Sequence, residues 1–212
     1  MRFINRHWYN IGGVVAIGTS TFLVFSWNTL DMLVRLQLLS FIAILVHQFE
    51  EYGWPGGGPA IMNRVIRKSD RPDRYPLNQF SAMLGNLLIT YTFYLITVFF
   101  PNVIWLGLMP MLFGFGQFPA HAIVGNLKLK SFYNPGLAAV LFLHIPVGIY
   151  YIYYVVSNGL ASRLDWVIAI VYLLIVLGLF GVLTYKVLPN RDSKYPFDKV
   201  EMERFRGAEK FG

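Results

Sequence analysis

The chain has 212 residues, of which 56% are hydrophobic and only 14% are charged, whereas a typical soluble domain carries about 25% charged residues. It contains no cysteine, which excludes disulfides, thiolate chemistry and cysteine-ligated metals. The formal net charge of +7 comes from loops and the C-terminal tail, so we expect membrane lipids and no nucleic acid as partners. This composition predicts an all-α, polytopic integral membrane protein.

Successive apolar stretches, each of about 20 residues and therefore long enough to span a membrane as a helix, follow one another along the chain. They cover residues 8–27, 30–51, 78–100, 103–124, 135–156 and 166–187. We therefore expect a bundle of about six transmembrane helices in one domain, residues 1–188, and a loosely ordered charged tail, residues 189–212. The loop 52–77 contains an amphipathic stretch, residues 60–68, which fits either a short helix on the membrane surface or a solvated connector.

Basic residues are distributed unevenly between the connecting segments. Sixteen Lys and Arg residues lie in the N-terminus, the loop 52–77, the loop before residue 135 and the chain from Lys186 onward, whereas Arg163 alone lies on the opposite side. Cytoplasmic loops of membrane proteins collect basic residues, so this asymmetry predicts that both termini are cytoplasmic.

The second predicted span ends in the sequence His47-Gln48-Phe49-Glu50-Glu51. Positions i, i+3 and i+4 share one face of a helix, so we expect the imidazole of His47 and the carboxylates of Glu50 and Glu51 to lie together. Ionisable groups at the edge of the hydrocarbon region are costly and usually mark a functional site.

Polar residues on other predicted spans fall at a similar depth. At a rise of about 1.5 Å per residue, His121 lies near the end of the fourth span and His144 lies roughly 15 Å into the fifth. Asn86, Gln117 and Asn126 lie in the same half of the predicted bundle, where their side chains could orient histidine rings and carboxylates.

Imidazole nitrogens and carboxylate oxygens are the ligands of zinc, iron and manganese sites. We therefore predict one divalent metal ion, zinc in the first place and iron as the alternative, held by His47, Glu50, Glu51, His121 and His144. A polar network that fixes helix packing without a metal is the simpler alternative. We also expect a pocket between the second, fourth and fifth helices.

These residues favour a metal-dependent intramembrane hydrolase that acts on a lipid or another apolar substrate. One glutamate of the pair Glu50 and Glu51 would bind the metal, and the other would serve as general base toward a metal-activated water. An iron-dependent membrane oxidoreductase, such as a lipid desaturase or hydroxylase, is the first alternative, and a cation or proton-coupled carrier is the second.

The five-residue pattern from His47 to Glu51, in a small protein with several spans, resembles the membrane HXXEE-motif family. The helix pattern and the later polar residues His121, Asn126 and His144 support this resemblance. It implies an important role for His47, Glu50 and Glu51, but it implies no particular reaction.

Overall fold

The computed structural model describes residues 2–205, and every element of regular structure in these residues is helical. This confirms the predicted all-α fold class. The elements, with η marking 3₁₀- and π-helical turns, are α1 (Arg2–Ser26), η1 (Trp27–Thr29), α2 (Met32–Tyr52), α3 (Gly58–Ala60), η2 (Ile61–Ile66), α4 (Gln79–Leu87), η3 (Leu88–Leu95), α5 (Ile96–Phe99), α6 (Ile104–Phe118), η4 (Pro119–Gly125), α7 (Asn126–Leu129), α8 (Leu137–Ala139), η5 (Val140–His144), α9 (Ile145–Ser157), α10 (Arg163–Val182), η6 (Leu183–Val187) and α11 (Lys199–Glu203).

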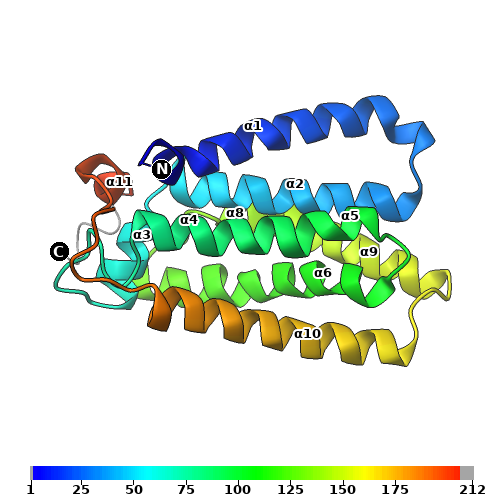
Figure 1. The fold of residues 1–212 in the computed structure, drawn as a ribbon. Helices are drawn as coiled ribbons and strands as arrows, with labels where there is room; N and C mark the ends of the chain where they lie inside the picture. Colours follow the sequence, from blue (N-terminus) through cyan, green and yellow to red (C-terminus); the bar gives the residue numbers. More distant parts are fainter. Residues whose placement is uncertain (1, 206–212) are drawn as a thin grey trace.

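The long helices lie side by side in a bundle, and α2 is the one that contacts most of the others (Figure 1). Helix α1 packs along one side of α2, where Gly12 and Gly13 let its backbone approach Leu45 and Phe49. Helix η3 and the α8–η5–α9 helix pack against its other sides. A central helix with neighbours on several sides can present side chains to several of them at once.

Within the described residues, five helices are long and apolar enough to cross a membrane, as expected of a multi-pass membrane protein. They are Phe3–Thr29, Met32–Tyr52, Gln79–Phe99, Leu137–Ser157 and Arg163–Val187. The sixth expected span forms a helix through the bundle as α6 and η4, but it contains two prolines, Gln117 and His121, which make it less apolar than these five. Its crossing of the membrane stays a prediction.

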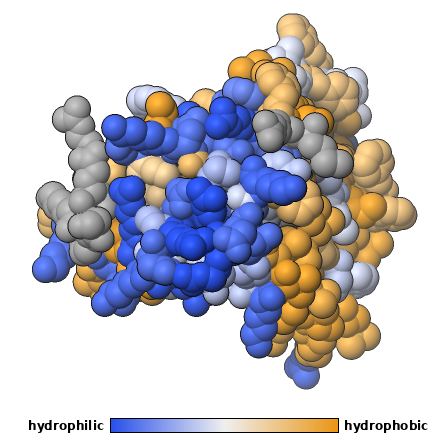
Figure 2. All heavy atoms as spheres, turned by 60° about the vertical axis from the view of Figure 1, so that its left-hand side comes forward, coloured by the Kyte–Doolittle hydropathy of each residue, from blue (hydrophilic) through white to orange (hydrophobic). Residues whose placement is uncertain are grey.

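One end of the bundle, here called the polar end, carries the start of α1, the loop between α2 and α4, and residues 188–205 (Figure 1). Figure 2 shows hydrophilic side chains gathered over this end and hydrophobic ones along the flank. The amphipathic stretch of the loop, α3 and η2, turns apolar side chains into the protein. Its Ile61 and Val65 are buried against Phe197 and Met202, because the C-terminal segment supplies the apolar partners.

The C-terminal segment is not loosely ordered up to residue 205, in contrast to the expectation from its charge. The backbone N–H of Phe197 donates to the carbonyl of Asp73 at 2.7 Å, and Arg204 donates to the carbonyl of Gly53 at 3.0 Å. These contacts tie the segment to the loop that follows α2. Residues 206–212 of the predicted tail lie outside the described part of the chain.

Candidate metal centre

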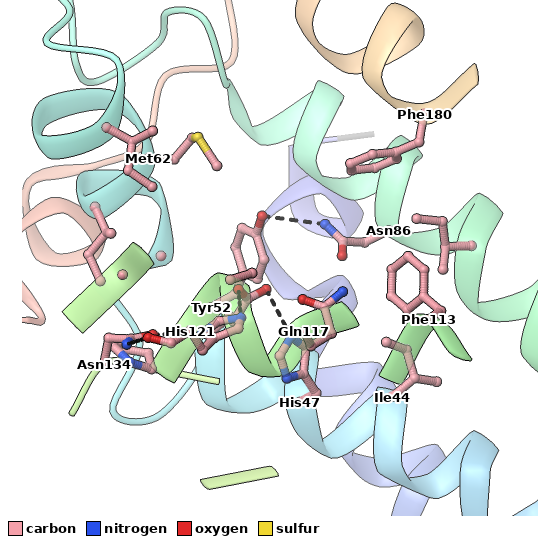
Figure 3. Close-up of a pocket in the computed structure, with 18 of the residues that line it drawn as sticks. Ile44, His47, Tyr52, Met62, Asn86, Phe113, Gln117, His121, Asn134 and Phe180 are labelled. Carbon is pink, nitrogen blue, oxygen red and sulfur yellow. Dashed lines mark hydrogen bonds and ion pairs between the residues drawn. The ribbon is translucent and has the colours of Figure 1, made fainter. Parts of the chain in front are cut away.

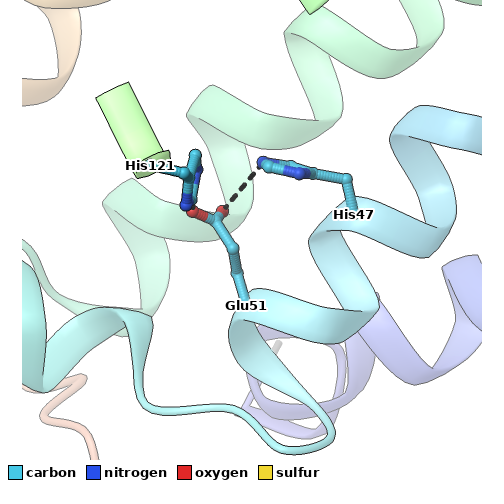
Figure 4. Close-up of side chains that lie close together, drawn as sticks. All are labelled: His47, Glu51 and His121. Carbon is cyan, nitrogen blue, oxygen red and sulfur yellow. Dashed lines mark ion pairs between the residues drawn. The ribbon is translucent and has the colours of Figure 1, made fainter. Parts of the chain in front are cut away.

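The motif at the end of α2 distributes its side chains among several neighbouring helices. His47 and Glu51, four residues apart, point to the same side of α2 (Figure 4). Gln48 donates to the hydroxyl of Thr90 on η3 at 2.6 Å, and Phe49 packs against α1. The motif therefore fixes the position of α2 in the bundle and also presents an ionisable pair.

His121 from η4 completes a cluster with this pair. Its Nε2 lies 3.5 Å from Oε1 of Glu51, and Nε2 of His47 lies 3.8 Å from Oε2 of the same carboxylate. One ligand atom from each residue lies within 4.8 Å of the other two. A π-helical turn beginning at Pro119 replaces the α-helical pattern beside His121, and such turns are frequent at functional sites. This geometry can hold a metal ion.

Hydrogen bonds to Nδ1 fix the orientation of both imidazole rings. Nδ1 of His47 lies 3.1 Å from the carbonyl oxygen of Gly136, which can only accept, so His47 donates from Nδ1. The amide nitrogen of Asn134 donates to the carbonyl of His121 at 2.8 Å and to Oδ1 of Asn126 at 2.7 Å. Its Oδ1 therefore accepts from Nδ1 of His121 at 2.6 Å. In neutral imidazoles with these hydrogen bonds, both Nε2 atoms carry lone pairs and point toward the carboxylate, the arrangement that hydrogen-bonding partners give to metal-bound histidines.

Gly136 lies between the two imidazole rings. A Cβ atom at this position would lie 2.5 Å from Cε1 of His121 and 2.9 Å from Cε1 of His47, closer than real contacts allow. Its φ of +101° is also in the region that favours glycine. Asn134 and Gly136 thus form, with the intervening proline, one short segment that positions both histidines.

The carboxylate of Glu50 does not face the histidines but accepts hydrogen bonds from residues 133–139. Its Oε1 accepts from the hydroxyl of Tyr133 at 2.8 Å and from the N–H of Ala138 at 3.0 Å, and its Oε2 accepts from the N–H of Ala139 at 2.7 Å. The carboxylate thereby satisfies free N–H groups at the start of the α8–η5–α9 helix. Burial and the bond to Glu50 raise the pKa of the Tyr133 hydroxyl. We call residues 133–139 the bracket, because they hold both α2 and His121.

His144 is buried beside His47, with the two ring centroids 5.5 Å apart, and it packs against Gly114. Its Nε2 has no hydrogen-bond partner among residues 2–205. It lies outside the group of three whose ligand atoms converge. Of the five residues predicted as ligands, the structure brings together the ligand atoms of His47, Glu51 and His121, whereas Glu50 binds the bracket and His144 packs behind His47.

The cluster borders a cavity of about 260 Å³ (Figure 3). We expected a pocket between the second, fourth and fifth helices, but its walls are α2, α4–η3, α6–η4 and α10–η6, with η2 at the polar end. The fifth helix is represented only by Asn134 and Pro135 in front of it, since α8–η5–α9 packs directly behind His47. The lining residues are Ile44, His47, Glu51, Tyr52, Gly58, Ile61, Met62, Ile66, Asn86, Ile89, Phe113, Gln117, Ala120, His121, Gly125, Asn134, Pro135, Leu177, Phe180 and Tyr185.

Asn86, Gln117 and Asn126, which we expected to orient the histidine rings and carboxylates, take different positions. Gln117 lines the cavity one helical turn from His121. Asn86 also lines it, and its amide donates to the hydroxyl of Tyr52 at 3.4 Å. Asn126 is not among the lining residues, but it accepts from Asn134 and so supports His121 indirectly. Of the three, Asn126 is the one connected by hydrogen bonds to a histidine of the cluster.

The sequence interpretation missed Tyr133, Asn134 and Gly136. The signal available for them was the Asn-Pro-Gly turn just before the fifth predicted span, because a turn of this kind has defined donors, acceptors and a positive φ.

Comparison with known proteins agrees with the motif. A family model described as a protein of unknown function with HXXEE motif matches residues 38–151, which is more than half of the chain. The matched region includes the three clustered residues and the whole bracket. Neither the curated proteins nor the solved structures contain a match. The chain therefore belongs to the family of proteins of unknown function with an HXXEE motif.

Proposed function

We propose that the protein is a metal-dependent hydrolase of the membrane, acting on a lipid or another apolar substrate. The observation that carries the proposal is the arrangement of His47, Glu51 and His121 at the wall of a cavity. Nδ1 of each imidazole is hydrogen-bonded to the bracket, and Nε2 of each points at the carboxylate of Glu51.

The three side chains fit a divalent cation. Lone pairs of two neutral imidazoles and the negative charge of Glu51 repel one another unless a cation or a proton lies between them. Two histidines and one glutamate form a known catalytic zinc set, which keeps a fourth position open. A bound zinc ion would act as a Lewis acid and lower the pKa of water at the site to ~7.

The surrounding residues supply the remaining functions of a hydrolytic site. Glu51 has two oxygens, so one can bind the cation while the other accepts a proton from the attacking water. Gln117 and Tyr52 line the cavity and can hydrogen-bond a polar group of the substrate. The role of general base therefore falls to Glu51 in this proposal, since three donors already bind Glu50.

A second candidate is an iron-dependent oxidoreductase such as a lipid desaturase or hydroxylase. The observation that favours it is the same donor set, because two histidines and one carboxylate with open positions also hold Fe(II) in non-haem oxygenases. The two candidates differ in the metal and in whether water or dioxygen supplies an atom to the product.

The proposal includes the orientation of the protein. We propose that the polar end faces the cytoplasm and that α6–η4 is a sixth span, so that both termini are cytoplasmic. The support is the accumulation of Lys and Arg in the segments at this end, compared with Arg163 at the other. A reporter fused after the last residue and active only on the external side would contradict it.

The reaction is tested by incubating the purified protein with a bacterial polar-lipid extract in ¹⁸O-labelled water, with zinc or with a chelator. We expect a zinc-dependent lipid product that carries one ¹⁸O atom from water and is not formed by the Glu51→Gln variant. An oxidised lipid formed with Fe(II) and dioxygen would instead support the second candidate. Release of no new lipid species with either metal would contradict both.

A further inference from the structure

The four long walls of the cavity share one order of polarity. From the polar end inward, the lining residues are Glu51, His47 and Ile44 on α2; His121, Gln117 and Phe113 on α6–η4; Asn86 and Ile89 on α4–η3; and Tyr185, Phe180 and Leu177 on α10–η6. Along these four helices, polar or ionisable groups therefore line the part of the cavity nearer the polar end, and aliphatic or phenyl groups line its deep part. The apolar side chains of Ile61, Met62 and Ile66 on η2 also line the cavity at the polar end. Figure 3 shows Ile44, Phe113 and Phe180 away from the histidines.

This order defines which molecules the cavity suits. A wholly polar ligand would lose hydration at the deep part without gaining hydrogen bonds, and a wholly apolar ligand would leave His121 and Gln117 without partners. A ligand with a polar group and an adjoining apolar segment satisfies both parts.

One lining residue of the deep part of the cavity is also exposed. Leu177 lines the cavity, and 42% of its surface is exposed. Within the described residues, α10 packs mainly on α6. Near its polar end, Gly85 leaves room for the ring of Phe180, since a Cβ there would lie 2.8 Å from Cε2 of that ring. These contacts leave Leu177 as the place where the deep part of the cavity can open toward hydrocarbon in a membrane.

The size of the cavity limits what can lie inside it. Its volume of about 260 Å³ is slightly below the ~300–1,000 Å³ typical of small-molecule sites. It can hold a polar group with one short apolar segment, and it has no room for two acyl chains. The rest of a longer chain must leave the cavity, and Leu177 is the deep lining residue that is also exposed.

From these observations we infer that the ligand is a single-chain amphiphile that enters sideways from the membrane leaflet at the polar end. Its polar group lies against His47, Glu51 and His121, and its chain passes between α10 and η3 beside Leu177. This inference rests on the proposed function for the reaction at the polar group, but the binding mode is tested separately.

The test uses a single-chain fatty acid that carries a photoactivatable diazirine in its chain. The purified full-length protein in phosphatidylcholine vesicles is irradiated with this probe, and the labelled residues are identified by mass spectrometry. We expect labelling of cavity residues such as Ile89 and Phe113. Labelling confined to outward-facing side chains of the bundle would overturn the inference.

Two substitutions on α10 make the test specific. Leu177→Trp places a bulky ring at the proposed opening, whereas Leu179→Trp changes a leucine that is 64% exposed and is absent from the cavity lining. Labelling of Ile89 and Phe113 should fall at least about fivefold in the first variant, a loss of ~1 kcal/mol of binding free energy, and should stay unchanged in the second. Equal labelling in both would overturn the sideways entry. Leu177→Phe provides a smaller plug if the tryptophan variant does not fold.

Separate measurements on the wild-type protein, of labelling on one side and of metal binding and product release on the other, distinguish this inference from the proposed function. If the protein binds no metal and releases no product while the labelling pattern holds, the hydrolase proposal fails and the amphiphile site stands. If metal binding and hydrolysis hold while the labelling pattern fails, the amphiphile site fails alone.

Discussion

Glu50 and Glu51 are adjacent in the sequence, but their carboxylates lie in two different environments on α2. The carboxylate of Glu50 accepts three hydrogen bonds from the bracket, at 2.7 to 3.0 Å. The carboxylate of Glu51 faces the Nε2 atoms of His47 and His121 at the cavity wall. A carboxylate whose oxygens already accept three hydrogen bonds is suited to holding two helices together. A carboxylate that faces two imidazole nitrogens is suited to binding a cation with them.

The difference indicates that the two glutamates of the motif have separate roles, one in packing and one at the candidate metal site. Successive residues on a helix point about 100° apart, so two adjacent glutamates cannot share one ligand position, but they can serve two neighbouring helices. The first glutamate fixes the bracket, the bracket fixes the histidines through Asn134 and Gly136, and the second glutamate joins the histidines. Each of the following predictions tests one part of this division.

The largest effect on stability is expected from Glu50→Gln. The amide NH₂ would face a hydrogen-bond donor of the bracket, leaving a buried donor unpaired and removing a charge from two or three bonds. We expect a loss of about 3 kcal/mol in the free energy of unfolding, measured by denaturant titration in detergent. Glu51→Gln is the matched control and should change the same quantity by less than about 1 kcal/mol. Equal losses in the two variants would contradict the division.

Gly136→Ala should disturb the site through both rings. The added Cβ forces the imidazoles of His47 and His121 apart, so the affinity for zinc should fall roughly 10- to 100-fold, the range seen when supporting residues of metal sites are changed. Competition with a zinc-sensitive dye measures this affinity. Gly116→Ala is the control, since a Cβ at Gly116 meets nothing within 4 Å. An unchanged affinity in the Gly136 variant would show that the bracket does not position the histidines.

His144→Phe sharpens the assignment of the ligands. His144 lies beside His47 but outside the converging group, so the number of zinc ions bound per chain should not change. A change of a few-fold in affinity is compatible with altered packing of His47. His121→Ala is the comparison and should abolish binding. Loss of the metal in the His144 variant would restore the larger ligand set predicted from the sequence.

Tyr133→Phe should reduce stability less than Glu50→Gln does. Loss of the bond to Glu50 at a half-buried hydroxyl should reduce the free energy of unfolding by about 1 kcal/mol at neutral pH. The pKa of Tyr133 is raised in the folded state, so its contribution is complete below the ordinary pKa of about 10 and is lost as the pH rises further. The wild type and the variant should therefore converge in alkaline solution. A difference that grows above pH ~10 would contradict this.

The bundle and part of the site were predictable from the sequence. Apolar runs of membrane length fix the fold class, and helical spacing places His47 and Glu51 on one face. The predicted proximity of His121 to these two residues rested on the similar depth of all three along their spans. The structure confirms that the ligand atoms of the three residues converge.

The remainder depended on rotation and packing, which residue spacing does not determine. Spacing puts Glu50 on the same face as His47, but the bracket offers it three donors at a slightly different angle, and it turns there. His144 lies at a suitable depth, but its helix is rotated so that it packs behind His47. The order of the C-terminal segment follows from Phe197 and Met202, whose burial could not be anticipated from the charge around them.

The central claim is that Glu51, with His47 and His121, binds a metal while Glu50 does not. The most direct measurement is the zinc content, by mass spectrometry of the element, of folded wild type, Glu50→Gln and Glu51→Gln after equilibration with zinc and removal of the excess. We predict about one zinc per chain in the wild type and in folded Glu50→Gln, and almost none in Glu51→Gln. Zinc retained by Glu51→Gln, or lost from folded Glu50→Gln, would contradict the claim.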